Sequence, residues 1–138
     1  MLAEPMQIEG VTVRSIVVFL MDELAAPAVG FLQNQATRVT TASALGLTSV
    51  TALERAIALL KEKEFDAAII FTAAHQSPYR AAYLCYLAGI PLRIAQSHEF
   101  GGGVLSHCFP PPADHPHWAL LQSIGLADGP PSAQRNLV

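Results

Sequence analysis

The sequence predicts an α/β fold with three layers, in which helices cover both faces of an open parallel sheet. The first observation is a largely apolar run at residues 65–72 that follows an amphipathic helix after only a tight turn, as a buried parallel strand does. The second is the order helix, strand, helix, strand over residues 51–95, which is typical of βαβ units. The third is a length of 138 residues with 51% hydrophobic residues, which suits one domain with a sizeable core and argues against disorder.

The N-terminal third holds one clear strand. Residues 1–12 show no clear period and are expected to form a loose lead-in. Residues 14–21 are rich in β-branched and aromatic side chains, which predicts a buried strand. Residues 22–48 are rich in Ala and Thr, and Pro27 and Gly30 interrupt any long helix, so a short helix and a loop are expected there.

The middle of the chain has clear start and stop signals. Ser49 or Thr51 caps a predicted helix that runs to about Glu64, and the strand at 65–72 follows it. The apolar stripe of this helix is formed by Leu53, Ile57 and Leu60.

A second helix and strand follow. Ser77 and Pro78 are a typical cap and first residue for a helix over residues 79–88, which ends at Gly89 in the left-handed conformation. A short strand is expected at 92–95. Beyond it the glycines and prolines of 100–103 and 110–112 indicate loops, residues 117–126 predict a short helix, and the tail at 128–138 is expected to be frayed.

Composition excludes several classes of function. Lys and Arg number 8 against 11 Asp and Glu, so the net charge is 8 − 11 = −3, and no basic run suggests nucleic-acid binding. The apolar run at 15–21 is far shorter than the roughly 20 residues of a membrane-spanning helix. Two cysteines are too few for a disulfide framework, so a reduced, cytoplasmic setting is expected. The charged fraction of 14% is low, which suggests that part of the surface meets a partner.

Two loops lie where an open parallel sheet binds ligands, at the carboxyl ends of its strands. The loop at 73–77 precedes a helix N-terminus, where Ser77 acts either as a cap alone or as a cap that also contacts a ligand. The loop at 96–103 combines polar side chains with three consecutive glycines. It lacks the dinucleotide fingerprint, so a binding loop and a mobile surface loop are both open.

Other chemical groups favour structural interpretations. His107, Cys108, His115 and His117 do not have zinc-site spacing, so exposed histidines in a Pro-rich segment are preferred over a metal site. Neighbouring Ser106 and His107 are expected to point apart, and no nucleophile elbow or Walker A loop occurs. The remaining candidates are expected to be packing residues: Cys85, Tyr79, Tyr83 and Tyr86.

Consecutive blocks of the sequence resemble glycosyltransferase family 9, the bacterial ADP-heptose:lipopolysaccharide heptosyltransferases and their relatives. The blocks are Phe-Asp-Ala-Ala-Ile-Ile-Phe-Thr at 65–72, Gln-Ser-Pro-Tyr at 76–79, Ala-Tyr-Leu-Cys-Tyr-Leu-Ala-Gly-Ile-Pro at 82–91 and Arg-Ile-Ala-Gln-Ser-His-Glu-Phe-Gly-Gly-Gly at 93–103. The likeness extends over residues 53–127. The family has a GT-B architecture of two Rossmann-like domains, of which the N-terminal one handles the acceptor and the C-terminal one binds the nucleotide-sugar.

The resemblance implies that residues 1–127 form such an N-terminal, acceptor-side domain, whose completeness is open, and that 128–138 are a flexible tail. Its partners would be an ADP-sugar donor, a glycan or lipid acceptor, and either a separate donor domain or another copy of the chain. The protein would be cytoplasmic or peripheral to the inner membrane, and no cofactor, metal or catalytic residue is assigned. The substrate-binding residues that the resemblance implies are Gln76, Ser77, Arg93, Ser97, His98, Gly101 and Gly102.

The sequence also departs from the family pattern. Asp22 follows a strand but lacks the glycines of the family's catalytic turn, and His98 stands where relatives often carry Lys. No donor domain is present in the sequence, so the chain alone is expected to be inactive. A non-catalytic α/β module for interaction or small-molecule binding is therefore the alternative, and a small metal-dependent enzyme is the weakest reading.

Overall fold

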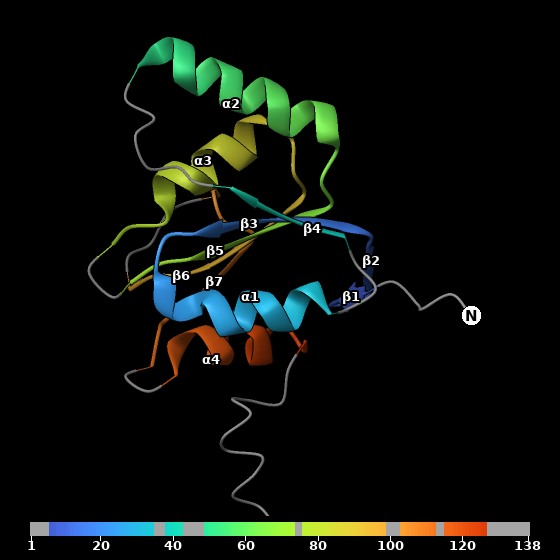
Figure 1. Ribbon diagram of the computed structural model, residues 1–138, viewed down its shortest axis with the longest axis vertical. Helices are drawn as coiled ribbons and strands as arrows, with labels where there is room; N and C mark the ends of the chain where they lie inside the picture. Colours follow the sequence, from blue (N-terminus) through green and yellow to red (C-terminus); the bar gives the residue numbers. More distant parts are fainter. Residues whose placement is uncertain are drawn as a thin grey trace, which may run out of the picture.

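The computed structural model has three layers, a central sheet between two pairs of helices (Figure 1). It describes residues 6–34, 38–42, 49–73, 76–98, 103–112 and 115–126. The predicted α/β fold with a Rossmann-like open parallel sheet is confirmed. The tail predicted at 128–138 lies outside the described residues.

The sheet has five strands in the order β4-β3-β5-β6-β7, and every neighbouring pair is parallel. These strands are β3 (Ser15–Leu20), β4 (Arg38–Ala42), β5 (Ala67–Phe71), β6 (Leu92–Gln96) and β7 (His107–Phe109). The order in which the chain adds strands reverses once, because β4 lies on one side of β3 and all later strands lie on the other. The central strands β3 and β5 are buried on both faces, which explains why their residues after Ser15 are apolar in unbroken runs rather than at alternate positions.

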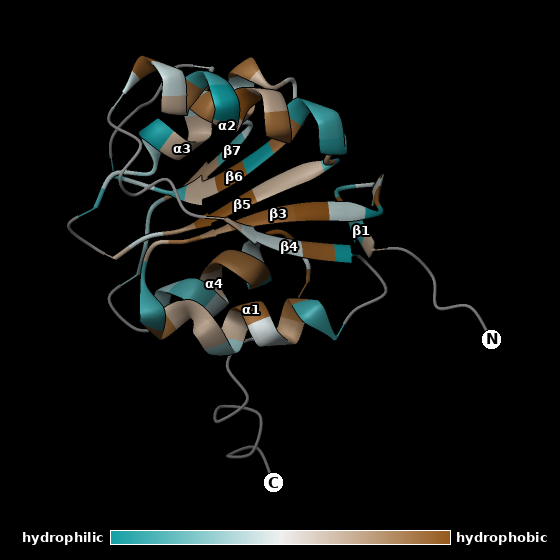
Figure 2. Cartoon of the chain, turned by 45° about the horizontal axis from the view of Figure 1, so that its top comes forward, coloured by the Kyte–Doolittle hydropathy of each residue, from teal (hydrophilic) through white to brown (hydrophobic). Residues whose placement is uncertain are grey.

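Each face of the sheet carries two helices and its own apolar cluster (Figure 2). One face packs against α1 (Ala26–Gln33) and α4 (Pro116–Ser123), the other against α2 (Val50–Lys63) and α3 (Tyr79–Leu87). Alternate residues of a strand enter opposite clusters: Val18 faces α1 and α4, whereas Val17 faces α2 and α3.

Residues at the starts and ends of the helices have clear structural roles. Ser49 caps α2, since its hydroxyl accepts a hydrogen bond from the Ala52 N–H at 3.1 Å. Gly89 follows α3 with φ of +80°, the left-handed conformation that glycine adopts most easily. Pro27 is tolerated because it falls in the first turn of α1, where its missing N–H has no intrahelical partner to lose.

The loose lead-in predicted for residues 1–12 is wrong over its described part. A hairpin is formed by β1 (Met6–Ile8) and β2 (Val11–Val13), which pair antiparallel. Glu9 and Gly10 both have positive φ, which is the geometry of a tight two-residue hairpin turn. Ile8 is fully buried in the cluster on the α1 and α4 face, so this hairpin closes one end of that core.

The loops predicted on either side of the central region also contain strands. β4 lies within 22–48, and its sequence Arg-Val-Thr-Thr-Ala mixes polar and apolar residues, which suits its partly exposed place at the edge of the described sheet. β7 lies between the glycines and the prolines, and its three residues are too few to show a period.

Candidate functional site

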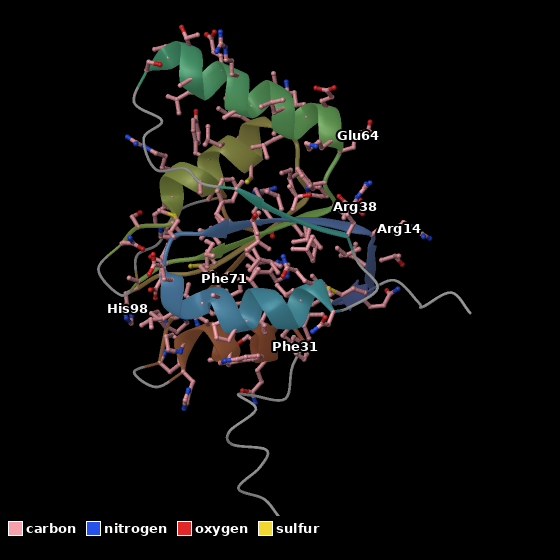
Figure 3. All side chains as sticks on the ribbon, viewed as in Figure 1. Arg14, Phe31, Arg38, Glu64, Phe71 and His98 are labelled. Atoms are coloured by element: carbon pink, nitrogen blue, oxygen red, sulfur yellow. The ribbon has the colours of Figure 1, made fainter. Side chains whose placement is uncertain are left out.

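The carboxyl ends of the parallel strands form one edge of the sheet, which we call the carboxyl edge. Neighbouring connections diverge there, because the chain leaves β3 toward α1 on one face and leaves β5 toward α3 on the other. Open α/β sheets bind ligands at this reversal of strand order. Figure 3 shows His98 at the carboxyl edge and Arg14, Arg38 and Glu64 at the opposite, amino edge.

Asp22 lies at this reversal, immediately after β3. The Met21 N–H donates to the Phe71 carbonyl at 2.9 Å, so the pairing of β3 with β5 continues up to the aspartate. One carboxylate oxygen, Oδ1, accepts from the Leu24 N–H at 3.2 Å and caps the short helix η1 (Glu23–Ala25). The other, Oδ2, lies 2.8 Å from Nε2 of His117.

His117 belongs to α4 and is only 6% exposed. Its ring meets Phe71 edge to face at 5.5 Å, and its Nδ1 is buried with no partner among the described residues. Because a carboxylate oxygen only accepts, Nε2 carries the proton of this bond. The expectation of an exposed histidine at 117 is therefore wrong, and the reason is the burial of this helix face against the sheet.

A second tether holds the start of α4 at the same edge. Gln96, the last residue of β6, is 7% exposed and its side-chain amide donates to the Pro116 carbonyl at 2.8 Å. We call the three residues Asp22, His117 and Gln96 the α4 clasp. It joins the ends of β3 and β6 to the N-terminus of α4. Its two bonds join residues that are 95 and 20 positions apart in the sequence.

The loop after β5 presents Gln76 and Ser77 at the carboxyl edge. The side-chain oxygen of Gln76 accepts from the Ala73 N–H at 2.8 Å, while its backbone N–H donates to the Ala73 carbonyl at 3.0 Å. These two bonds tie Gln76 to Ala73 and fix the Gln76 side chain. The Ser77 hydroxyl accepts from the Tyr79 N–H at 3.2 Å and its side chain is exposed, but Pro78 rather than the predicted Ser77 occupies the N-cap position of α3.

The loop after β6 adds Ser97 and His98 to this edge. Ser97 extends the sheet by donating its N–H to the Phe109 carbonyl at 3.0 Å, and His98 is exposed beyond it. Four of the residues that the resemblance implied, Gln76, Ser77, Ser97 and His98, thus follow neighbouring strands at one edge. Gly101 and Gly102 lie outside the described residues.

Arg93 does not join them, because it is the second residue of β6 and its side chain lies at the amino edge. Its guanidinium also lies over the Tyr86 ring, 5.3 Å from the centroid. The guanidinium donates to the backbone carbonyls of Ile90, Pro91, Gly103 and Val104. These bonds fasten the segments that precede β6 and β7, so the geometry of Arg93 is that of a structural residue.

The amino edge also holds the second histidine–carboxylate pair. Nε2 of His107 lies 2.5 Å from the Glu9 carboxylate in the hairpin turn, and its Nδ1 lies 2.9 Å from the Ser106 hydroxyl. The expectation that Ser106 and His107 point apart is therefore wrong. The serine is nevertheless held in the ladder, since its oxygen accepts from the Arg93 N–H at 2.7 Å. Within the described ranges, no three His, Cys, Asp or Glu residues are grouped as metal ligands would be.

Two packing expectations have different outcomes. Cys85 is buried as predicted, and burial raises the pKa of its thiol to about 12, with Arg93 opposing the shift. Tyr83 and Tyr86 are packing residues as expected, but they are about half exposed and stack on each other, with 6.3 Å between ring centroids, rather than in the core. Tyr79 is partly buried against the α2 and α3 cluster.

Sequence reasoning missed the α4 clasp, although Asp22 had one usable signal. A polar residue immediately after a buried parallel strand lies at the ligand-binding edge of such sheets.

No family model, curated protein or solved structure matches this chain. In the part of the chain that the structure describes, none of the helices has the length and apolar character needed to cross a membrane.

Proposed function

We propose that this chain is the acceptor-side half of a glycosyltransferase resembling the heptosyltransferases of glycosyltransferase family 9. The observation that carries the proposal is the gathering of Gln76, Ser77, Ser97 and His98 at the carboxyl edge of a parallel sheet. Binding at this edge is general for doubly wound sheets. The sequence blocks that resemble the family are the ones that supply these residues.

The four side chains are suited to sugar hydroxyls. Amide, hydroxyl and imidazole groups donate and accept hydrogen bonds without requiring a charged partner. Gln76 is already fixed by its bond to the Ala73 N–H, so its amide nitrogen is pre-oriented at low entropic cost. Asp22 is engaged with Leu24 and His117, so we assign it a structural role rather than that of a catalytic base. The ADP-sugar and the groups that stabilise its departing diphosphate belong to a donor half.

The proposal is tested by titrating the ¹⁵N-labelled chain with a heptose-containing lipopolysaccharide core oligosaccharide and following amide shifts. We expect shifts confined to the loops after β5 and β6, and weaker binding in Gln76→Ala and His98→Ala. Arg38→Ala is the matched control, because Arg38 is an exposed polar residue at the opposite edge. An absence of shifts at millimolar oligosaccharide, or shifts centred on the amino edge, would contradict the proposal.

A non-catalytic interaction module is the second candidate. It is favoured by large apolar side chains on the surface of a chain with few charges, among them Leu24 at 81%, Val50 at 71% and Leu59 at 57% exposed. One of them, Leu59, lines an apolar groove beside β4, and an exposed apolar groove is typical of contacts with other proteins. Under this reading the oligosaccharide titration gives no shifts, and the chain self-associates or binds another protein instead.

A further inference from the structure

β4 is an edge strand whose outer side is unpaired within the described sheet. The Arg38 N–H donates to the Arg14 carbonyl at 3.0 Å, which sets the alternation along the strand. In a parallel pair, residues alternate between bonding the neighbouring strand and facing away from it. Arg38, Thr40 and Ala42 therefore bond β3. The N–H and C=O groups of Val39 and Thr41 point out of the sheet.

This outward pattern is self-complementary, and we infer that β4 pairs antiparallel with β4 of a second copy of this chain. In an antiparallel pair, two opposed residues exchange both of their hydrogen bonds. With the two-fold axis at Thr40, Val39 of each copy lies opposite Thr41 of the other. That register satisfies the outward N–H and C=O groups of both residues in both copies and leaves no described outward group of the strand unused.

The side chains along the strand fit the same register. Thr40 meets Thr40 of the second copy at a non-hydrogen-bonded position, where threonine pairs are favourable. Arg38 lies opposite the small Ala42, so the two arginines sit at opposite ends of the pair, about 13 Å apart along the strands. That separation exceeds the screening length in physiological salt, so like charges do not oppose the pairing.

An apolar groove next to β4 gives the second observation. The groove has a volume of about 250 Å³ between α2 and the β3–β4 side of the sheet, and among its lining residues only Lys63 is charged. Leu59 lines it and is 57% exposed. A two-fold axis perpendicular to the sheet reverses strand direction but keeps the faces, so the grooves of both copies lie on the same side of the joined sheet. One arrangement therefore satisfies the strand edge and brings two apolar grooves together.

This interface is independent of the proposed sugar-binding function. Antiparallel pairing directs the carboxyl edges of the two copies in opposite directions, and Gln76 and His98 lie away from β4 on the far strands' loops. Both candidate sites stay open in the dimer. Failure of the interface thus leaves the oligosaccharide titration unaffected, and failure of that titration leaves the interface standing.

Sedimentation equilibrium of the whole chain over a hundredfold concentration range tests the interface. We expect a monomer–dimer equilibrium that shifts at least tenfold toward monomer in Thr41→Pro, which removes an outward N–H but no bond to β3. Val50→Pro is the matched control, because it places proline at the first residue of α2, outside the groove. Leu59→Glu is expected to weaken the dimer likewise, whereas Leu24→Glu, on the other helix layer, leaves it unchanged. Circular dichroism establishes that each variant is folded.

The register is tested separately in a Cys108→Ser background by Thr40→Cys. Opposed residues at a non-hydrogen-bonded site lie about 4.5 Å apart between Cα atoms, which is within the range that a disulfide spans. We expect mild oxidation to give a covalent dimer, and Thr12→Cys on the exposed hairpin to give none. A monomer at every concentration, or a dimer that persists in both folded variants Thr41→Pro and Leu59→Glu, would overturn the inference.

Discussion

Among the described residues, two histidine–carboxylate pairs join distant parts of this chain, and they lie at opposite edges of the sheet. His117 and Asp22 are separated by 95 residues and His107 and Glu9 by 98, so the two pairs close loops of nearly equal length. Their surroundings differ. The side chains of the first pair are 7% and 16% exposed, whereas those of the second are 16% and 57% exposed.

The two pairs show that a shorter contact need not contribute more to the stability of the fold. The Glu9–His107 contact is the shorter of the two, at 2.5 Å against 2.8 Å. Water nevertheless reaches the Glu9 carboxylate and solvates it when the pair breaks, so little free energy is lost. Asp22 and His117 have less access to water, so breaking their contact removes one hydrogen bond from a largely buried carboxylate or leaves the buried imidazole Nε2 without its acceptor. Burial, rather than distance, therefore sets the order of the expected effects.

The largest effect is expected for His117→Ala. The substitution removes the donor to Asp22 and the edge-to-face contact with Phe71, and it leaves a cavity under α4. We expect a loss of about 3 kcal/mol in the free energy of unfolding, as for other broken buried pairs. Urea denaturation followed by circular dichroism measures it. Trp118→Phe is a control in the same helix, since it keeps an aromatic ring against Phe31. A loss below about 1 kcal/mol would mean that the pair behaves as an exposed one.

The next effect is expected for Gln96→Ala, which breaks the other tether of the α4 clasp. Its amide donates to the Pro116 carbonyl from a buried position, so we expect a loss of about 1–2 kcal/mol. Both tethers hold the same end of α4. Once His117 is replaced, that end is free to detach, and the double variant should lose less than the sum of the single losses. Additive losses would show that the two tethers act independently.

How far these features follow from the sequence depends on whether their cause is local. α2, β5 and α3 were predictable because their caps, stripes and apolar runs are read within a few turns of chain, as at Ser49 and Gly89. β4 and β7 were not, since short strands are specified by the partner they pair with. The α4 clasp was missed for the same reason, because the residues around His117 do not indicate that its partner is a carboxylate 95 positions away.

The thiol of Cys85 distinguishes detachment of α4 from global unfolding. Cys85 is a buried residue of α3 on the other face of the sheet, and burial raises the pKa of its thiol to about 12. We expect a thiol reagent at pH 8 to modify exposed Cys108 at once and Cys85 only on unfolding, in the His117→Ala variant as in the parent. The unfolded thiol ionises near 9.0, so its contribution to stability is intact below pH 9 and declines as pH rises toward 12. Rapid modification of Cys85 in folded His117→Ala would show that the two faces open together.

The smallest effect is expected for the exposed pair at the amino edge. His107→Ala and Glu9→Gln should each cost about 0–1 kcal/mol, because Glu9 is more than half exposed and water replaces its partner. What remains of the effect should fall further in 1 M salt, where the screening length is about 3 Å. Ser106→Ala separates the ion pair from the ladder, since Ser106 also accepts from the Arg93 N–H and its removal leaves that donor unsatisfied. If His107→Ala proved as costly as His117→Ala, burial could not explain the difference between the two edges, and loop closure by the hairpin would have to be the main contribution of this contact.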